Sequence, residues 1–481
     1  MSRPFTPAGP AGPARALMRS RLCDYSVRMA LRTHPKEILS GPILKTLLKL
    51  SIPNIIAMSF HTAFNFVDRL FVSRLGELEF GALGMAFTVQ SVLIAIGSGT
   101  GIGTASLIAR YIGAGKQREA NNAAEHTLLI ILLLAVLISL CGPLLAPSFF
   151  RLLGASEAML PYILGYINII LYGSFFQLFT MIGNGILRGE GNTVTPMRVM
   201  VSGTLINIVL DPVLIFGLGP LPALGVRGAA LATVAGRAVS SAILAVALFK
   251  GRNIVRLESL RDVRLFRFDT GIIRGIFGVG GPTVVSHLTH SLGLSLLFVI
   301  IRPYGDMAKA AFTMGFTYQQ IAILPLIGLA SGNMTMTGQN YGARNMERIA
   351  RIFKTALLFS LALISCFSLI FILTRGMLPR IFSSNTEVIR IGKTLLLIFS
   401  VGFPPLAGRI MLTGFFQGLG RGFRALFLNL SQMVLFAIPL ALLLSRLIGL
   451  EGVWTGMVLG NLLSMLLGLV WARRALQGLR A

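Results

Sequence analysis

Four polar side chains stand in otherwise apolar stretches of the sequence, and their types suit the handling of a cation or a proton. Asp68 follows a long apolar run. Asn207 and Asp211 lie four residues apart in "NIVLDPVLIFG", and Thr233 closes the run "GVRGAALAT". Carboxylate, amide and hydroxyl oxygens suit a hard cation such as Na⁺, and two neighbouring carboxylates in a low dielectric readily share a proton. These residues are therefore candidates for a cation or proton coupling site.

The composition predicts that membrane-spanning helices position these side chains. The 481 residues are 54% hydrophobic and 12% charged, with a mean hydropathy of +0.78, whereas soluble domains carry about 25% charged residues. Lipid offers no hydrogen-bond partners, so the backbone of a span must form its hydrogen bonds within the protein. The sequence also lacks the alternation of apolar and polar residues that is typical of strands, so the spans are expected to be helices. Twelve stretches are long enough to span: 44–75, 82–110, 126–150, 159–187, 196–218, 225–249, 273–301, 308–337, 350–373, 388–416, 425–447 and 451–472.

The candidate residues are predicted to lie at one depth in the membrane. Asp68 and Asp211 stand eight and six residues before the outer ends of their spans, and Thr233 stands eight residues after the outer start of its span. A rise of 1.5 Å per residue places all three roughly 10–12 Å below the outer face. Asn207 shares a helix face with Asp211, because residues i and i+4 align. A membrane charge costs about 2.5–3.5 kcal/mol and commonly marks an ion path or proton relay.

The sequence also repeats itself with an offset of 229 residues. "IARYIGAGKQREA" (108–120) resembles "TGQNYGARNMERI" (337–349), with Gly113 falling on Gly342. Two homologous halves of six helices are expected, and because six is even they are parallel repeats. The same offset pairs Pro53 with Pro282, His61 with His290, and Gly185, Gly189 and Gly191 with Gly414, Gly418 and Gly420.

The repeat and the charge pattern together define the expected domains and topology. We predict a disordered basic tail (1–43), an N-terminal lobe (44–249), a linker (250–272), a C-terminal lobe (273–473) and a second tail (474–481). The acids do not repeat, since the offset places leucines opposite Asp68 and Asp211. The coupling chemistry is therefore assigned to the N-terminal lobe alone.

The net charge of +26 is distributed as expected for a membrane protein. With both termini in the cytoplasm, the inside segments hold 30 Lys and Arg residues, the outside loops 11, and the spans only two. This bias follows the positive-inside rule and argues against nucleic-acid binding, for which no motif is present. The N-terminus lacks the apolar core of a signal peptide. We therefore expect a multi-pass protein of the cell inner membrane with cytoplasmic termini.

The motifs resemble those of the MATE (multidrug and toxic compound extrusion) transporters, most closely the DinF-like bacterial branch. "LLKLSIPNIIAMSFHTAFNFVDRLFVSRLG" (47–76) resembles the first helix of that family, "GEGNTVTPMRVMVSGTLINIVLDPVLIFG" its fourth and fifth helices, and "GQNYGARNMERIAR" (338–351) the second-half counterpart. The resemblance covers about residues 44 to 473. It implies an all-α fold of twelve helices, in two lobes around a V-shaped central cavity.

The same resemblance implies antiport of organic, often cationic, compounds against H⁺ or Na⁺, with no other cofactor. It assigns the cation or proton site to Asp68, Asn207, Asp211 and Thr233, and a conformational hinge to Pro53. A helix lacking an i→i−4 hydrogen bond can kink there. A monomer is expected.

This sequence departs from the family pattern at two basic residues. Arg69 directly follows Asp68, and Arg237 lies one turn beyond Thr233 at a depth too great for snorkelling. Arg237 is a candidate charge partner of Asp68 or Asp211. A guanidinium beside these acids would compete with Na⁺, which favours H⁺ as the coupling ion without excluding Na⁺.

Further polar residues in the spans are candidates for the wall of a substrate cavity. Amide, aromatic, imidazole and thioether side chains suit amphipathic organic substrates. A metal site is not expected, because the two histidines spaced i, i+3 have no further ligand nearby in the sequence. The candidates are Gln90, Gln177, Met314, Tyr318, Gln319, Gln320, His287, His290 and Arg409.

Two other functions are compatible with a polytopic two-lobe protein. A flippase for a lipid-linked saccharide would need several basic residues facing its cavity, and the spans contain only two arginines. A membrane enzyme would need acids or histidines clustered at the membrane surface, often around a metal, and no such grouping or catalytic residue is recognised. An ion-coupled exporter is therefore the preferred interpretation.

Overall fold

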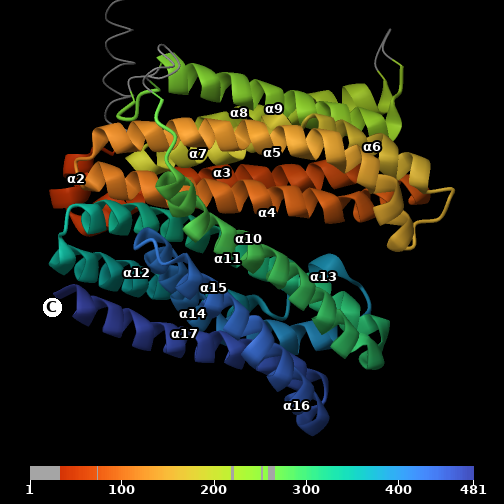
Figure 1. The fold of residues 1–481 in the computed structure, drawn as a ribbon. Helices are drawn as coiled ribbons and strands as arrows, with labels where there is room; N and C mark the ends of the chain where they lie inside the picture. Colours follow the sequence, from red (N-terminus) through yellow and green to blue (C-terminus); the bar gives the residue numbers. More distant parts are fainter. Residues whose placement is uncertain (1–32, 73, 218–221, 251–252, 258–265, 481) are drawn as a thin grey trace, which may run out of the picture.

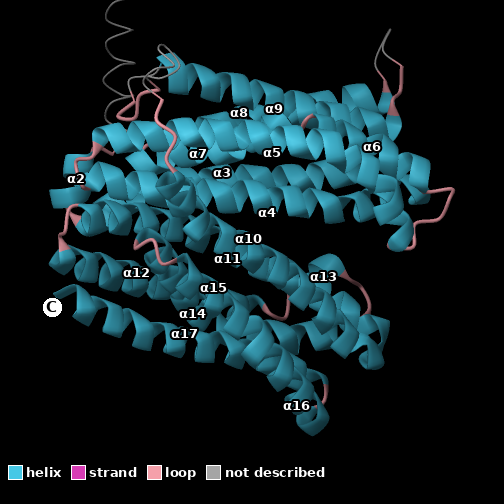
Figure 2. Ribbon diagram, viewed as in Figure 1, coloured by secondary structure: helices cyan, strands magenta, loops and turns pink. Residues whose placement is uncertain are grey.

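The computed structural model describes residues 33–480, except 73, 218–221, 251–252 and 258–265. All the regular secondary structure among these residues is helical (Figure 2). The N-terminal half comprises α2 (Pro35–Ser40), α3 (Ile43–Val72), α4 (Glu77–Gly113), α5 (Gln117–Leu152), α6 (Leu160–Tyr172), α7 (Ser174–Glu190), α8 (Val194–Phe216) and α9 (Gly225–Lys250). The C-terminal half comprises α10 (Thr270–Ile301), η2 (Arg302–Tyr304), α11 (Gly305–Gly342), α12 (Met346–Thr374), α13 (Leu378–Phe382), α14 (Thr386–Gly418), α15 (Gly422–Leu430), η3 (Ser431–Ala437), α16 (Ile438–Ile448) and α17 (Leu450–Arg480).

These helices confirm the prediction of twelve membrane spans. Within the described part of the chain, ten segments are long and apolar enough to cross a membrane, and one of them, Thr270–Gly342, holds both α10 and α11. The pair α6 and α7 qualifies together as a broken span, bent by 51°. Counting α10 and α11 separately and the bent pair as one span gives twelve.

The bend between α6 and α7 was not predicted from the sequence. It occurs at Gly173, where a Cβ atom would lie 2.6 Å from a methyl carbon of Val234 on α9. The hydroxyl of Ser139 donates a 3.0 Å hydrogen bond to the carbonyl of Leu171 beside the break. The bend therefore combines a close helix approach with a side chain that satisfies an exposed carbonyl.

The two halves pack against each other mainly near one end of the bundle, where α2 and the last turns of α17 lie (Figure 1). We call this end the terminal face. There α10 packs on α4, and α11 packs on α3 and α4. Glycines allow the close approach: a Cβ atom on Gly113 would collide with the carbonyl of Gln339, and one on Gly342 with the carbonyl of Arg110.

Polar contacts between the halves lie in the same region. The amide of Asn54 donates to the hydroxyl of Ser331 (3.3 Å), and the amide of Gln339 donates to the carbonyl of Gly189 (3.1 Å). The hydroxyl of Ser106 donates to the carbonyl of Gln417 (2.5 Å). Each of these residues lies on the terminal-face side of the midpoint of its helix or beyond its end.

Toward the opposite end, the far face, the two halves diverge (Figure 1). The packing of helix α10 changes along its length in the same way. Gly280 packs closely on Gly99 of α4, and its neighbours Val279 and Thr283 are buried. From Val285 onward most side chains of α10 are half-buried or exposed. The two halves are therefore joined at the terminal face and separated beyond it.

Two predicted tail boundaries differ from the structure. Within the segment 1–43, residues 35–40 form α2, whose Ile38 is fully buried against both halves, while residues 1–32 lie outside the described residues. Within the segment 474–481, α17 continues to Arg480, and Ala475 is buried. The low complexity of the first tail obscured a short helix that packs through a single apolar side chain, and the second boundary followed hydropathy, which ends before the helix does.

Candidate functional site

The candidate site lies in the N-terminal half, where α8 and α9 approach closely. Small residues permit this packing: a Cβ atom on Gly236 would lie 2.8 Å from the carbonyl oxygen of Gly203 and 3.1 Å from the Cβ of Asn207. The hydroxyl of Ser240 donates a 3.0 Å hydrogen bond to the carbonyl of Val199. The polar faces of α8 and α9 are thereby fixed relative to each other, as in other small-residue membrane contacts.

Asp211 is the most deeply buried member of the site. Its side chain has no exposed surface, and its Oδ1 atom accepts a 3.0 Å hydrogen bond from the amide of Asn207. The other oxygen, Oδ2, has no hydrogen-bond partner among the described residues. A buried carboxylate oxygen without a partner is costly. This atom is therefore available to a proton or to a bound cation.

Asp68 and Asp211 belong to two different helices, α3 and α8. Helix α3 packs on α8, and the two carboxylates lie within electrostatic range of each other. Asp68 is half-buried. The side chain of Arg69, which follows it, lies outside the described residues. The charges of the two acids thus act on each other, and the shared site and its role in coupling stay predictions.

Thr233 and Tyr166 complete the polar cluster. Both side chains are buried, and the Tyr166 hydroxyl faces Thr233 while lying within electrostatic range of both acids. Sequence reasoning missed Tyr166, which stands in the apolar run "LPYILGYINIILY". Its depth is similar to that of the acids, because Tyr166 lies six residues, or roughly 9 Å, after the start of α6.

Arg237 lies beside this cluster, within electrostatic range of Tyr166 and His61. Its predicted pairing with Asp211 is not observed: the hydrogen bond of Asp211 comes from Asn207, and no ion pair among the described residues joins Arg237 to Asp211. Arg237 is one turn beyond Thr233 on α9, and its positive charge acts on Tyr166.

Pro53, the predicted hinge, is buried in the interior of α3. It cannot donate a backbone hydrogen bond to the carbonyl four residues earlier. The next residue, Asn54, donates its side-chain amide to the carbonyl of Leu50 (3.1 Å) and bridges to Ser331 of α11. The weak point of α3 is therefore tied to the other half, which is a suitable position for a hinge.

Three of the predicted cavity residues are instead packed in the protein core. Met314 and Tyr318 belong to the main hydrophobic cluster of the C-terminal half, and the Tyr318 hydroxyl donates to the carbonyl of Leu378 (2.9 Å). Gln177 is 1% exposed, and its amide contacts the sulfur of Met181. In the described conformation these three side chains take part in helix packing, which the sequence does not reveal, and their role in a substrate cavity stays a prediction.

The remaining cavity candidates are accessible to different degrees. Gln90 and Gln319 are half-buried, whereas Gln320, His287 and His290 are exposed. Each lies on the far-face side of its helix, beyond the contacts between the halves. Their role in substrate binding stays a prediction. Arg409 belongs to a separate polar cluster in the C-terminal half.

Known proteins resemble this chain both in sequence and in fold. The MatE family model matches this chain twice, at residues 53–213 and 282–443. The "FAD transporter" of Shewanella oneidensis is 29% identical over 434 residues, covering 89% of this chain and 93% of that protein. The "Probable multidrug resistance protein NorM" of Thermotoga maritima is 27% identical, covering 88% of this chain and 90% of that protein.

A solved structure described as the "Outward-facing conformation of a multidrug resistance MATE family transporter of the MOP superfamily" superimposes with a TM-score of 0.88. It is 32% identical in sequence, and the alignment covers 93% of this chain and 99% of that one. The two matches of the family model begin 229 residues apart, at Pro53 and Pro282, which confirms the internal repeat. The sequence, the twelve-span fold and these matches together show that the chain belongs to the MATE family of transporters.

Proposed function

We propose that this protein is a secondary active exporter of small organic compounds, driven by the inward movement of H⁺ or Na⁺. The family membership supports export, and relatives named as multidrug resistance and multidrug export proteins support organic substrates. The observation that supports the coupling proposal is the electrostatic interaction of Asp68 with Asp211, whose neighbours include Asn207 and Tyr166.

In each transport cycle the coupling ion would bind at the site in the N-terminal half and would then be released on the other side of the membrane. The free Oδ2 atom of Asp211 and the carboxylate of Asp68 would receive it, and Asn207 would hold Asp211 in a fixed orientation. Neutralising the two acids removes their mutual repulsion and their desolvation cost. The neutral and the charged site would then favour different arrangements of α3, α8 and α9, with Pro53 as the flexible point.

The topology supports an outward-facing state for the described conformation. We place the terminal face in the cytoplasm, because most of the Lys and Arg residues flank that side of the spans. The halves are packed together at this face and diverge beyond it. A transporter in this arrangement would be closed to the cytoplasm and open to the outside of the cell inner membrane. It would act as a monomer.

Flavin nucleotides are a second candidate substrate class. The observation in favour is the 29% identity with a relative named as an FAD transporter, over nearly the whole of both chains. Export of a phosphate-bearing compound would require basic residues where the substrate binds, and organic cations would not.

Everted membrane vesicles provide the test of export and coupling. Ethidium would be added outside, and either an acidic lumen or a Na⁺-loaded lumen would be imposed on vesicles with and without the protein. We expect ethidium to accumulate with the acidic lumen, and weakly or not at all with Na⁺, because Arg237 opposes a resident metal cation. Accumulation that is independent of both gradients would contradict ion-coupled export.

A further inference from the structure

A second charged cluster lies inside the C-terminal half, and the group at its centre is a cation, whereas the site in the N-terminal half contains two acids. Its centre is Arg409 of α14. The Nε atom of Arg409 donates a 3.0 Å hydrogen bond to Oδ1 of Asn461 on α17, and Nη1 donates to Oδ1 of Asn429 on α15. Asn429 in turn donates to the hydroxyl of Ser286 on α10 (3.4 Å). Four helices thus fix the position of one guanidinium.

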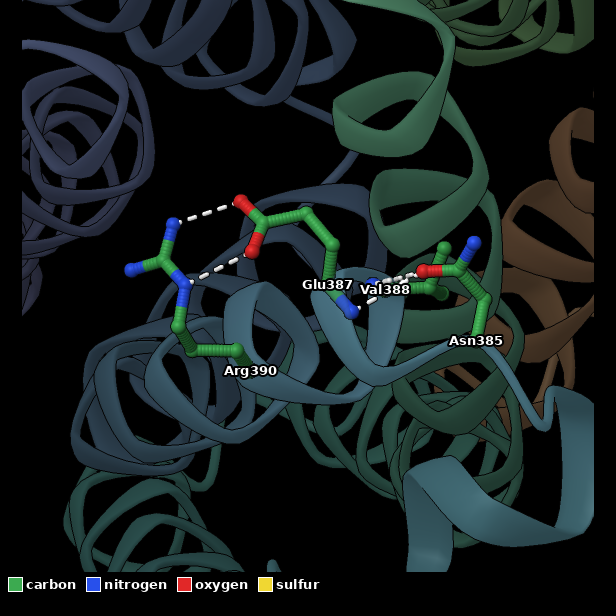
Figure 3. A network of polar contacts seen from close by, with 4 residues as sticks. All are labelled: Asn385, Glu387, Val388 and Arg390. Atoms are coloured by element: carbon green, nitrogen blue, oxygen red, sulfur yellow. Dashed lines mark hydrogen bonds and ion pairs between the residues drawn. The ribbon is translucent and has the colours of Figure 1, made fainter.

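Both groups that hold Arg409 are neutral amides. The C-terminal half has five acids, all at the beginning of a helix: Asp269, Asp306, Glu347, Glu387 and Glu451. Figure 3 shows one of them, Glu387, paired with Arg390 in the first turn of α14. No ion pair among the described residues includes Arg409.

The guanidinium therefore keeps both its charge and part of its donor capacity. An arginine side chain has five N–H donors and does not deprotonate in proteins. Two donors go to the asparagines, and the other three have no acceptor among the described residues. An arginine placed only to join helices would be expected to find a carboxylate or several carbonyls, because an uncompensated charge within a membrane bundle is costly.

Two histidines of α10, His287 and His290, lie beside this cluster. His290 lies within electrostatic range of Arg409 and His287. Both histidines are exposed, on the part of α10 that has left its packing against α4. The π-helical turn η3 (Ser431–Ala437) begins two residues after Asn429, and π-helical turns are frequent at functional sites. The two histidines are therefore exposed next to a half-buried Arg409, and the cluster is built into an irregular part of the fold.

We propose that Arg409, positioned by Asn429 and Asn461 and adjoined by His290, is a binding subsite for an anionic group of the substrate, a phosphate or a carboxylate. This inference rests on the proposed export function and specifies its substrate class. Bidentate geometry and weak hydration make a guanidinium suitable for such oxygens. The exported molecules would thus include amphipathic anions, with the anion held in the C-terminal half, away from the acids of the N-terminal half.

Flavin mononucleotide and riboflavin are matched probes, because they share the fluorescent ring system and differ by one phosphate. Binding to the full-length protein in phosphatidylcholine nanodiscs would be followed by flavin fluorescence. We expect the mononucleotide to bind about tenfold more tightly than riboflavin, the scale of one charge-assisted contact. Arg409→Gln should bring the ratio of the two affinities close to one while riboflavin binding persists.

Two further variants separate this effect from general loss of charge or of folding. Arg446→Gln removes a positive charge from an exposed position near the end of α16, and it should leave the affinity ratio as in the wild type. Asn461→Asp keeps Arg409 but supplies an internal carboxylate at its Nε atom, so it should lower the affinity for the mononucleotide as Arg409→Gln does. Equal affinities for the two flavins, no binding of the mononucleotide, or a ratio insensitive to Arg409→Gln would overturn the proposal.

A lipid headgroup and a dissolved substrate carry the same anionic chemistry, and a change of lipid distinguishes them. If phosphatidylglycerol in the nanodisc lowers mononucleotide affinity in the wild type but not in Arg409→Gln, the headgroup occupies the subsite. If it has no effect, the dissolved anion does so alone, and either result supports the subsite. Ion-driven ethidium export, measured separately, tests the proposed function. Failure of the flavin preference with export intact overturns the subsite only.

Discussion

At the scale of single residues, Asp211 combines complete burial with an incomplete set of hydrogen bonds. One oxygen accepts from Asn207, while the other has no partner among the described residues. A purely structural aspartate in a membrane helix would be expected to satisfy both oxygens with nearby donors. The arrangement instead leaves one acceptor available next to a second acid, Asp68, which suits reversible binding of a positive charge.

We propose that Arg237 influences which cation the site accepts. We expect Arg237→Gln to let a Na⁺ gradient drive export, lowering the Na⁺ concentration for half-maximal rate by about tenfold, because removing one nearby positive charge changes cation binding by more than 1 kcal/mol. The measurement is ethidium accumulation in everted vesicles over a range of lumenal Na⁺ concentrations.

The matched control is Arg227→Gln, which removes an exposed arginine from the first turn of the same helix, α9. It should behave as the wild type does. If Arg237→Gln shows no increase in Na⁺ dependence, or if both variants show the same increase, Arg237 has no role in ion selection.

The depth of the polar residues could be read from the sequence, whereas their rotational placement could not. Counting residues from the ends of the spans placed Asp68, Asp211 and Thr233 at one level, because helical rise is fixed. Tyr166 lies at that level too, but its run contains three tyrosines and nothing marks the one that faces inward. Helix rotation depends on packing at Gly203 and Gly236, and that packing is a property of the folded bundle.

At the scale of secondary-structure elements, the crossing of α4 and α11 at the terminal face holds the described conformation together. Gly113 and Gly342 are equivalent positions in the internal repeat, and each meets the backbone of the opposite helix. A side chain at either position would push α4 and α11 apart, since the obstacle is backbone and cannot rotate away.

We expect Gly113→Ala to destabilise the state in which the terminal face is closed. Cysteine labelling from the cytoplasmic side, at a single cysteine introduced near this crossing, should become several-fold faster. Gly278→Ala on α10 is the control, because nothing lies within 4 Å of its added Cβ atom. Unchanged labelling in Gly113→Ala, or equal acceleration in the control, would show that this crossing does not gate access.

The element boundaries that sequence reasoning misjudged have identifiable causes. Hydropathy identifies only the part of a helix that lies in lipid. The spans predicted from it therefore ended before the polar last turns of α4, α11 and α17. The break at Gly173 depends on a contact with Val234 that is remote in sequence. The helices themselves were predictable, because lipid permits few other ways to satisfy the backbone.

At the scale of the whole molecule, the two homologous halves carry different charged groups in their interiors. The N-terminal half contains Asp68 and Asp211, and the C-terminal half contains Arg409 without a compensating acid among the described residues. The repeat gives both halves the same helical frame, and the family model matches each of them. A few side-chain differences within that frame would then place ion coupling in one half and substrate binding in the other.

The measurement that tests the central claim most directly is export by acid variants in everted vesicles with an acidic lumen. Asp211→Asn and Asp68→Asn should each reduce gradient-driven ethidium accumulation at least about tenfold while the purified proteins keep wild-type thermal stability, because a neutral amide cannot exchange a proton. Glu387→Gln, an exposed acid paired with Arg390, should export normally. Wild-type export by Asp211→Asn would contradict the account, since the coupling ion would then bind elsewhere.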